Sequence, residues 1–178
     1  ENKKIVTNSE GANMMQGIAT QMINHSQLNL GVPADAVILE VDEGTLPLLM
    51  AQVTPTLLVM NNLFPDQEDR FGSADGLMAH LNQMIPNHKY TRLLLNGNDP
   101  RLVKIGMDHP NNKPIYYGVE GGNFDQPTHH ISCPVCGTPL NYSKHYYEHI
   151  GIFSCPNGDF STPAIDYLAS NIQLKEET

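Results

Sequence analysis

The stretch "RLLLNGNDP" at residues 92–100 decides the fold class, because a short apolar run leads directly into a turn. Residues 92–96 have the composition of a strand, and the Gly, Asn, Asp and Pro that follow are signals for a turn. Similar apolar runs alternate with helical periodicity from residue 4 to about residue 118. This alternation predicts an α/β domain with a largely parallel sheet flanked by helices.

Four more strands are predicted around this stretch, at residues 4–8, 36–41, 56–62 and 114–119. Apolar residues recur at helical spacing over residues 14–22 and 77–85, and Pro86 ends the second run. A short helix is predicted after Leu46, since Pro47 suits the first turn of a helix.

Three of the predicted strands end in polar side chains. These clusters are Glu40 with Asp42 and Glu43, Asn61 with Asn62, and Asn96 with Asn98 and Asp99. Ligands bind at the carboxyl ends of strands in open parallel sheets, so we expect the clusters to converge on one crevice. A nucleotide and its metal ion would bind there.

Glu40 falls inside the apolar run "AVILEV" at residues 36–41, which has the composition of a buried central strand. A buried carboxylate needs a partner, and Mg²⁺ with its preference for oxygen ligands would supply one. The alternatives are a buried Lys, Arg or His as the partner, or a side chain that reaches solvent at the strand end. Residue chemistry alone does not decide among them.

The loop "NNLFPDQEDRFGS" at residues 61–73 is rich in amides and carboxylates, although such loops are usually solvated surface. The segment at residues 95–100 is equally consistent with a plain turn that starts a helix. A phosphate-binding P-loop needs Gly-Lys followed by Ser or Thr, and no Lys in this sequence directly follows a Gly. An ATP site would therefore be incomplete within this chain.

All three cysteines lie near the end of the chain, and "CPVCG" from Cys133 to Gly137 has the spacing of a zinc knuckle. Cys155 follows 19 residues after Cys136, which is typical of a zinc ribbon. Gly158 stands where a fourth cysteine would be expected. The sequence predicts Zn²⁺ bound by Cys133, Cys136 and Cys155, or a pair of metal-free hairpins held by aromatic side chains.

Tetrahedral zinc takes four ligands, so the three thiolates leave one position to be filled. Four candidates remain open: His149, Asp159, His145 or a water molecule. His149 is the better donor by chemistry, and Asp159 is nearer to the expected position in the ribbon.

The formal net charge of −9 argues against nucleic acid as a partner, because binding of phosphate backbones depends on Lys and Arg. No apolar run is long enough for a membrane span, and the first residues lack the apolar core of a signal peptide. We therefore expect a cytoplasmic protein. The chain starts at Glu1 without Met, so we also expect it to be part of something longer.

Taken together, five segments resemble the central domain of Mur ligases. These are "TNSEGANMMQGIAT" (7–20), "AVILEVDEGTLP" (36–47), "VMNNLFPDQEDRFGS" (59–73), "LLLNGNDP" (93–100) and the late insertion that starts at "CPVCGTPLNY" (133–142). The ribbon within a Mur-type domain is similar to the MurT branch of the family, and Gln67, where many Mur ligases carry His, favours that branch. The resemblance implies a P-loop NTPase-like domain over residues 1–125, a zinc-ribbon-like insertion over 126–163, and a C-terminal extension of the central domain over 164–178.

The resemblance also implies roles for individual residues. Glu40 would hold Mg²⁺ at the ATP phosphates, and Asn96 and Asp99 would lie against the adenosine part of the nucleotide. Further residues would line the crevice: Asn62, Asp66 and Asp69 in the polar loop, and Glu10 and Asn13 in the "NSEGAN" loop. The family's "GTNGKT" phosphate loop would lie upstream of Glu1 and its C-terminal domain after the ribbon, so we expect this chain alone to be inactive.

MurT-type proteins are the ligase subunits of lipid II isoglutaminyl synthases, so the resemblance implies ATP-dependent amidation of D-glutamate in lipid II. The carboxylate would be activated as an acyl phosphate, with ammonia supplied by a GatD-type glutaminase partner. Lipid II would bring the protein to the inner face of the membrane. Two alternatives stay open: a Mur-type ligase that adds an amino acid to a peptidoglycan precursor, and a non-catalytic zinc-ribbon interaction module.

Overall fold

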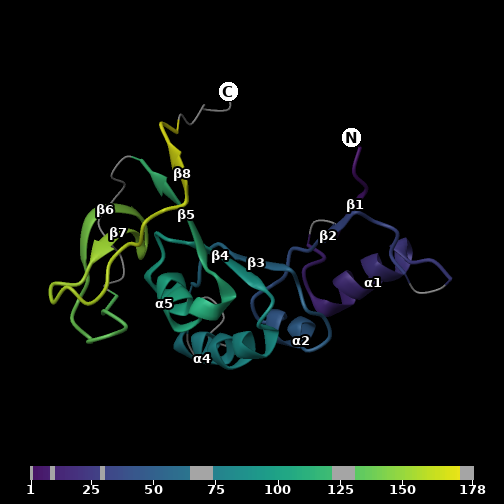
Figure 1. Cartoon of the computed structure of the whole chain (residues 1–178), viewed down its shortest axis with the longest axis horizontal. Coiled ribbons are helices and arrows are strands. Elements are labelled where there is room, and N and C mark those ends of the chain that lie inside the picture. Colours follow the sequence, from purple (N-terminus) through teal and green to yellow (C-terminus); the bar gives the residue numbers. More distant parts are fainter. Residues whose placement is uncertain (1, 9–10, 29–30, 65–73, 122–130, 173–178) are drawn as a thin grey trace.

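The main sheet of the protein has four parallel strands in the order β3-β4-β5-β8, as seen in a computed structural model (Figure 1). The structure describes residues 2–8, 11–28, 31–64, 74–121 and 131–172. The strands of this sheet are β3 Leu57–Met60, β4 Arg92–Asn96, β5 Ile115–Glu120 and β8 Tyr167–Ser170. The predicted α/β class with a parallel sheet and flanking helices is confirmed.

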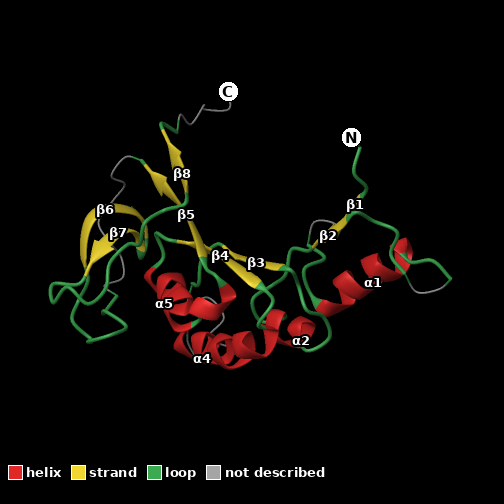
Figure 2. Cartoon of the chain, viewed as in Figure 1, coloured by secondary structure: helices red, strands yellow, loops and turns green. Residues whose placement is uncertain are grey.

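Helices α4 (Ala74–Met84) and α5 (Pro100–Asp108) cover one face of this sheet (Figure 2). The central strand β4 contributes Leu93 and Leu95, both fully buried, to a core that includes residues of both helices. The helix α5 approaches the sheet closely at Gly106, where a Cβ atom would lie 2.9 Å from the Tyr116 Cζ and 3.0 Å from the Leu95 Cδ1. Short 3₁₀ helices, η2 (Ile85–His88) and η3 (Pro110–Asn112), follow the two helices.

The amino-terminal strands form a separate two-stranded parallel sheet. It pairs β1 (Ile5–Thr7) with β2 (Ala36–Ile38), and helix α1 (Met15–His25) connects the two strands. Helix α2 (Leu46–Met50) follows with Pro47 in its first turn, as predicted. Figure 1 shows this sheet and α1 beyond β3, at the end of the molecule away from β8.

The expectation of a buried central strand at residues 36–41 is wrong. Strand β2 ends at Ile38, all three of its residues are exposed, and Glu40 lies beyond the strand with its side chain exposed. The backbone of Glu40 pairs with the side chain of Asn8, whose Nδ2 donates to the Glu40 backbone oxygen at 2.8 Å. The Glu40 N–H in turn donates to the Asn8 Oδ1 at 2.9 Å. A side chain thus takes the hydrogen bonds that would extend the ladder, so the strand ends early.

The cysteine-bearing segment forms a hairpin of strands β6 (Asn141–Tyr147) and β7 (Ile150–Ser154), which pair antiparallel. Its apolar side packs with Val103 of α5 and Tyr116 of β5, so the hairpin rests on the main domain. After this segment the chain returns to the main sheet, where β8 pairs in parallel with β5. The fourth strand of the main sheet therefore lies downstream of the hairpin.

We expect Leu93→Ala to lower the free energy of unfolding by about 2–5 kcal/mol, because it leaves a cavity beside the fully buried α4 and α5 residues. The measurement is urea unfolding followed by circular dichroism. Leu48→Ala is the matched control, since Leu48 in α2 is 61% exposed and its truncation creates no cavity. Equal losses in the two variants would contradict the described core.

Candidate functional site

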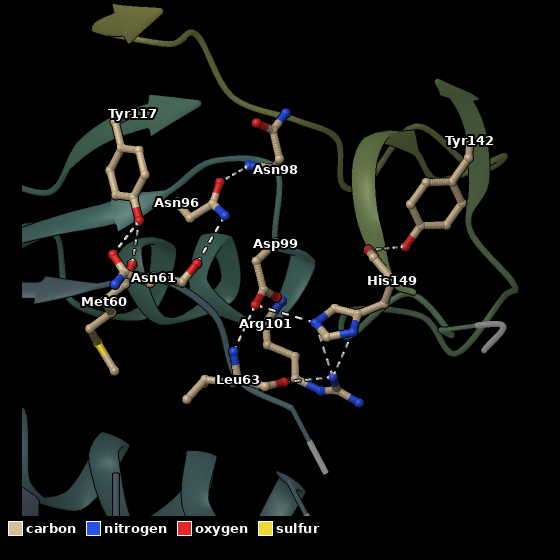
Figure 3. Close-up of polar contacts among 10 residues, drawn as sticks. All are labelled: Met60, Asn61, Leu63, Asn96, Asn98, Asp99, Arg101, Tyr117, Tyr142 and His149. Atoms are coloured by element: carbon tan, nitrogen blue, oxygen red, sulfur yellow. Dashed lines mark hydrogen bonds and ion pairs between the residues drawn. The ribbon is translucent and has the colours of Figure 1, made fainter. Parts of the chain in front are cut away.

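Polar side chains at the carboxyl ends of β3 and β4 contact one another and a tyrosine within β5 (Figure 3). The Asn96 Nδ2 donates to the Asn61 backbone oxygen at 2.9 Å, which joins β4 to the end of β3. The Tyr117 hydroxyl donates to the Asn61 Oδ1 at 2.7 Å, and burial raises the pKa of Tyr117, so the phenol stays a neutral donor. The predicted meeting of two of the polar clusters, at Asn61 and Asn96, is confirmed.

Asn98 connects this edge to the hairpin. Its Oδ1 accepts the Val119 N–H of β5 at 2.7 Å, and its backbone oxygen accepts the Gly151 N–H of β7 at 2.9 Å. The side chain is 2% exposed, and Gly118 beside it has no room for a side chain, since a Cβ there would lie 2.7 Å from the Asn98 Oδ1. Asn98 is therefore a structural link between sheet and hairpin.

The carboxylate of Asp99 is fully buried and holds three segments that are distant in sequence. Its Oδ1 accepts the Arg101 N–H at 2.8 Å, which caps α5, and its Oδ2 accepts the Leu63 N–H at 2.9 Å. The His149 Nε2, in the turn between β6 and β7, lies 3.3 Å from the same Oδ2 (Figure 3). We call the set Asp99, Arg101, His149 and Leu63 the Asp99 clamp.

Arg101 closes the clamp. Its Nη1 donates to the Leu63 backbone oxygen at 2.9 Å and lies 3.4 Å from the His149 Nδ1 and 3.2 Å from the His149 Nε2 (Figure 3). If the His149 Nε2 donates to Asp99, the Nδ1 is an acceptor, and it can take the Arg101 hydrogen. The Phe64 ring packs edge-on against the His149 ring, with the two ring centres 5.1 Å apart. The clamp thus fixes Leu63 and Phe64, which belong to the described first part of the predicted polar loop at residues 61–73.

The clamp places Asp99 differently from the expectation. Asp99 was predicted to lie against adenosine, but its carboxylate is 0% exposed and both oxygens are occupied by protein groups. Asn62 is exposed at the end of β3. The predicted residues Asp66 and Asp69 lie outside the described residues.

A second group of predicted residues gathers near Glu40. Asn8 binds the Glu40 backbone and also donates from its Nδ2 to the Ala12 oxygen at 2.8 Å. The Asp42 N–H donates to the Asn13 oxygen at 3.0 Å, so the loop after β1 lies against the loop after β2. The side chain of Glu40 is exposed, and that of Asn13 is partly buried. The predicted Glu10 lies outside the described residues.

The three cysteine sulfurs lie within 4.8 Å of one another, with Cys133 and Cys155 buried and Cys136 exposed. The Cys136 and Cys155 sulfurs are 3.4 Å apart, close to the about 3.8 Å expected between two thiolates on one tetrahedral Zn²⁺. Hydrogen bonds from Thr138 chiefly, and also from Asn157 and Cys155, lower the pKa of Cys136 to about 7. The donor set is therefore compatible with a metal that prefers thiolates.

Each of the two cysteine turns contains a glycine, four residues after Cys133 in the first and three residues after Cys155 in the second. The Gly137 N–H donates to the Cys133 oxygen at 2.8 Å, and the Gly158 N–H donates to the Cys155 oxygen at 2.9 Å. Both glycines have a left-handed backbone, with φ of 76° and 78°, which favours glycine over residues with a side chain. Gly158 thus serves as the turn glycine of the second knuckle.

No described His, Asp or Glu joins the three sulfurs. His149 is not near them as a ligand, because its ring belongs to the Asp99 clamp, and Asp159 is exposed outside the group. The His145 Nε2 forms a hydrogen bond with the Glu148 backbone oxygen and does not join the sulfurs. Asn157 comes near the sulfurs instead, with its Nδ2 3.4 Å from the Cys136 Sγ and 3.1 Å from the Thr138 Oγ1. The structure gives no support to His149 or Asp159 as the fourth ligand.

Sequence reasoning missed Asn8, the link that Asn98 makes to the hairpin, and the clamp roles of Arg101 and His149. Asn8 directly follows a predicted strand, which is a signal that could have placed it at the crevice. No local pattern pairs Asp99 with His149, because the two belong to different modules.

The chain was compared with known proteins. No protein-family model matches it. It is 37% identical over 163 residues to the lipid II isoglutaminyl synthase (glutamine-hydrolyzing) subunit MurT of Staphylococcus aureus (strain COL). The matched residues make up 88% of this chain and 35% of the relative. It is 31% identical over 174 residues to the MurT subunit of Streptococcus pneumoniae (strain ATCC BAA-255 / R6), covering 95% of this chain and 38% of the relative. The chain thus spans little more than a third of these relatives.

A solved structure with a similar fold is a pseudomurein peptide ligase type C from Methanothermus fervidus, with a TM-score of 0.68 and 21% identity. The match covers 94% of this chain and 33% of that protein, and at this identity it shows the fold alone. The resemblance to Mur ligases and to MurT, predicted from sequence motifs, is confirmed. Among the described residues, no helix is both long and apolar enough to cross a membrane.

We expect Asp99→Ala to lower the free energy of unfolding by about 3–5 kcal/mol, because it leaves the buried His149 imidazole and the N–H groups of Leu63 and Arg101 without their partner. The measurement is chemical denaturation at neutral pH. The control is Asp108→Ala at the other end of α5, where a partly exposed pair with Lys104 is worth about 0.5 kcal/mol or less. A loss for Asp99→Ala as small as that of the control would show that the clamp does not form.

Proposed function

Because this chain is homologous to MurT subunits over most of its own length, we propose that it is the central part of an ATP-dependent ligase subunit. The proposed reaction converts the α-carboxylate of D-glutamate in the lipid II stem peptide to the amide of D-isoglutamine. The observation that carries the proposal is identity of 31–37% to proteins named as subunits of that synthase. The relatives favour neither an amino-acid-adding ligase nor a non-catalytic zinc-ribbon module.

The reaction needs activation because a carboxylate is too poor an electrophile for ammonia. A carboxylate oxygen would attack the γ-phosphorus of ATP, which gives an acyl phosphate and ADP. Ammonia would then attack the acyl carbon, the bond from carbon to the phosphate oxygen would break, and a proton would leave the nitrogen. The relatives are described as glutamine-hydrolysing, so the ammonia would come from a glutaminase subunit of the GatD type.

Glu40 would hold Mg²⁺ in part. Its exposed carboxylate and its fixed backbone support this proposal. The carboxylate is exposed at the end of β2, while Asn8 fixes the Glu40 backbone on both its N–H and its oxygen. Mg²⁺ usually takes one or two carboxylates together with waters and substrate phosphates, so one accessible oxygen ligand is a fitting contribution. When bound, the ion would neutralise charge on the transferred phosphoryl group.

The other predicted site residues, apart from Asp99, would line the crevice. Asn96 and the neighbouring Asn61 would present polar atoms to the nucleotide from the carboxyl edge of the main sheet. Asp99 would act through the clamp, by fixing the start of the loop with Asn62, Asp66 and Asp69. Glu10 and Asn13 would face the crevice from the loop after β1, where Asn13 already contacts Asp42.

Zn²⁺ would be a structural ion in this protein, bound by Cys133, Cys136 and Cys155. Backbone N–H groups of Val135 and Asn157 lie 3.4 Å from the Cys133 and Cys155 sulfurs, and such donors stabilise thiolates. Water would take the fourth position, because no described His, Asp or Glu side chain lies with the three sulfurs.

The reaction is tested in the full-length protein that contains this chain, with its glutaminase partner, ATP, Mg²⁺, glutamine and lipid II. We expect glutamine-dependent amide formation, detected by mass spectrometry of the stem peptide. Glu40→Gln should slow it by about 100-fold or more, since metal-ion stabilisation of the transition state is worth several kcal/mol.

The matched control is Asp35→Asn, at the other end of the β2 segment, where the carboxylate accepts the Lys4 N–H. This variant should keep the activity of the unaltered protein. Incorporation of an amino acid in place of ammonia would overturn the proposed reaction, whereas full activity of Glu40→Gln would remove Glu40 from the metal site and leave the reaction standing.

Zinc is tested by elemental analysis of freshly purified protein. We expect one equivalent, lost in Cys133→Ser because two thiolates hold Zn²⁺ far more weakly than three. His149→Gln and Asp159→Asn should both retain the metal, since neither side chain lies with the sulfurs. Protein that contains no zinc, or that loses it in His149→Gln alone, would contradict the proposed ligand set.

A further inference from the structure

A basic pocket of about 580 Å³ lies at the end of the main sheet opposite the polar cluster. We define it by its three cations, Lys89, Arg92 and Lys113. Arg92 is the first residue of β4, and Lys113 comes just before β5, so both lie at the amino ends of parallel strands. Asn96 ends β4 and Asn61 directly follows β3, so both lie at the opposite, carboxyl edge of the sheet, and the two sites are separate.

The charge of the basic pocket is unusual for this chain. The sequence has 10 Lys and Arg against 19 Asp and Glu, and three of those ten cations line one pocket that no carboxylate lines. Two other cations in the described residues pair with acids, Lys104 with Asp108 at 2.6 Å and Lys144 with Glu120 at 3.5 Å. Within the same ranges, no ion pair is formed by Lys89, Arg92 or Lys113. Like charges grouped without a counter-charge favour an anion from solution.

Buried side chains hold the floor of the basic pocket in place. The Asn112 Nδ2 donates to the His88 oxygen at 3.0 Å and to the Thr91 oxygen at 2.8 Å, and Asn112 is only 4% exposed. The Thr91 hydroxyl donates to the Pro55 oxygen at 2.6 Å. These bonds join the segment with Lys89 and Arg92 to the segment with Lys113. The backbone positions of the three cations are therefore set before any ligand arrives.

Two further features suit a phosphate-bearing ligand. The Lys89 ammonium lies 5.1 Å from the centre of the Tyr90 ring, which holds the charge at the pocket wall and leaves an exposed aromatic face. Lys113 has a left-handed backbone with φ of 48° at the end of η3. Arg and Lys are the usual partners of phosphate, Arg through paired N–H donors and Lys as a point charge.

We propose that the basic pocket binds a small soluble anion that carries phosphate groups, such as a phosphomonoester or a diphosphate. The volume lies within the range of small-molecule sites. The concave shape fits a small ligand better than a flat bilayer surface, and the net charge of −9 opposes attraction of the whole chain to anionic lipid. The site is independent of the proposed amidation and of its nucleotide crevice.

The test is a titration of the ¹⁵N-labelled chain with pyrophosphate, without Mg²⁺, followed by NMR. We expect saturable shifts at the amides of Thr91, Arg92, Asn112 and Lys113, with a dissociation constant of about 10 μM to 1 mM, as a few charge-assisted contacts would give. Shifts confined to Asn61, Asn96 and Gly97 would place the ligand at the other end of the sheet and overturn the proposal.

Charge-matched variants separate the pocket from a general effect of charge. The triple variant Lys89→Gln, Arg92→Gln and Lys113→Gln should bind pyrophosphate at least about tenfold more weakly. The control Lys3→Gln, Lys4→Gln and Lys144→Gln removes the same charge elsewhere and should bind as the unaltered chain does. Equal affinity of the two triple variants would contradict the pocket.

Two further measurements test whether the pocket binds a membrane instead, and whether the triple variant fails only because it does not fold. Sedimentation with phosphatidylglycerol vesicles should show no binding, and vesicle binding without pyrophosphate binding would replace the soluble ligand by a membrane surface and refute the proposal. If the triple variant loses the dispersed spectrum of a folded protein, the single variants Lys89→Gln and Lys113→Gln, both at exposed positions, decide in its place. Unchanged affinity in both would refute the pocket.

Discussion

The buried carboxylate of Asp99 is the group on which the arrangement of the described domain depends. A charge removed from water costs several kcal/mol unless hydrogen bonds and opposite charges replace its hydration. Two backbone N–H groups, from Leu63 and Arg101, and the imidazole of His149 provide that replacement. Each of these groups comes from a different segment, so the carboxylate is satisfied only when loop, helix and hairpin are all in place.

This requirement gives the cysteine-bearing hairpin a defined relation to the main sheet. His149 enters the clamp, Asn98 exchanges contacts with Gly151, and the apolar side of the hairpin packs on Val103 of α5. The Tyr142 hydroxyl donates to the His149 backbone oxygen at 2.8 Å, which fixes the turn from within the hairpin. The hairpin is thus part of the support for the loop that starts at Leu63. In the proposed ligase, that loop would border the nucleotide crevice.

Much of the main sheet was predictable because it depends on local patterns. The strand at residues 92–96 and its helix-starting turn appear where predicted, since apolar composition and a capping Asp act over a few residues. The buried strand at residues 36–41 was not found, because the hydrogen bonds at Glu40 go to Asn8, 32 positions away in sequence. His149 stayed a candidate for the fourth zinc ligand for the same reason: its partner Arg101 is 48 positions away. Long-range side-chain contacts leave no periodic signal.

The most direct measurement of the clamp is a double-mutant cycle between Asp99 and His149, with Asp99→Asn, His149→Gln and the double variant compared by chemical denaturation. A pair in contact within one buried network shows a coupling of about 0.5–3 kcal/mol, so the double variant should be more stable than the sum of the single losses implies. Additive losses, within about 0.3 kcal/mol, would contradict a direct interaction and with it the anchoring of the hairpin through Asp99.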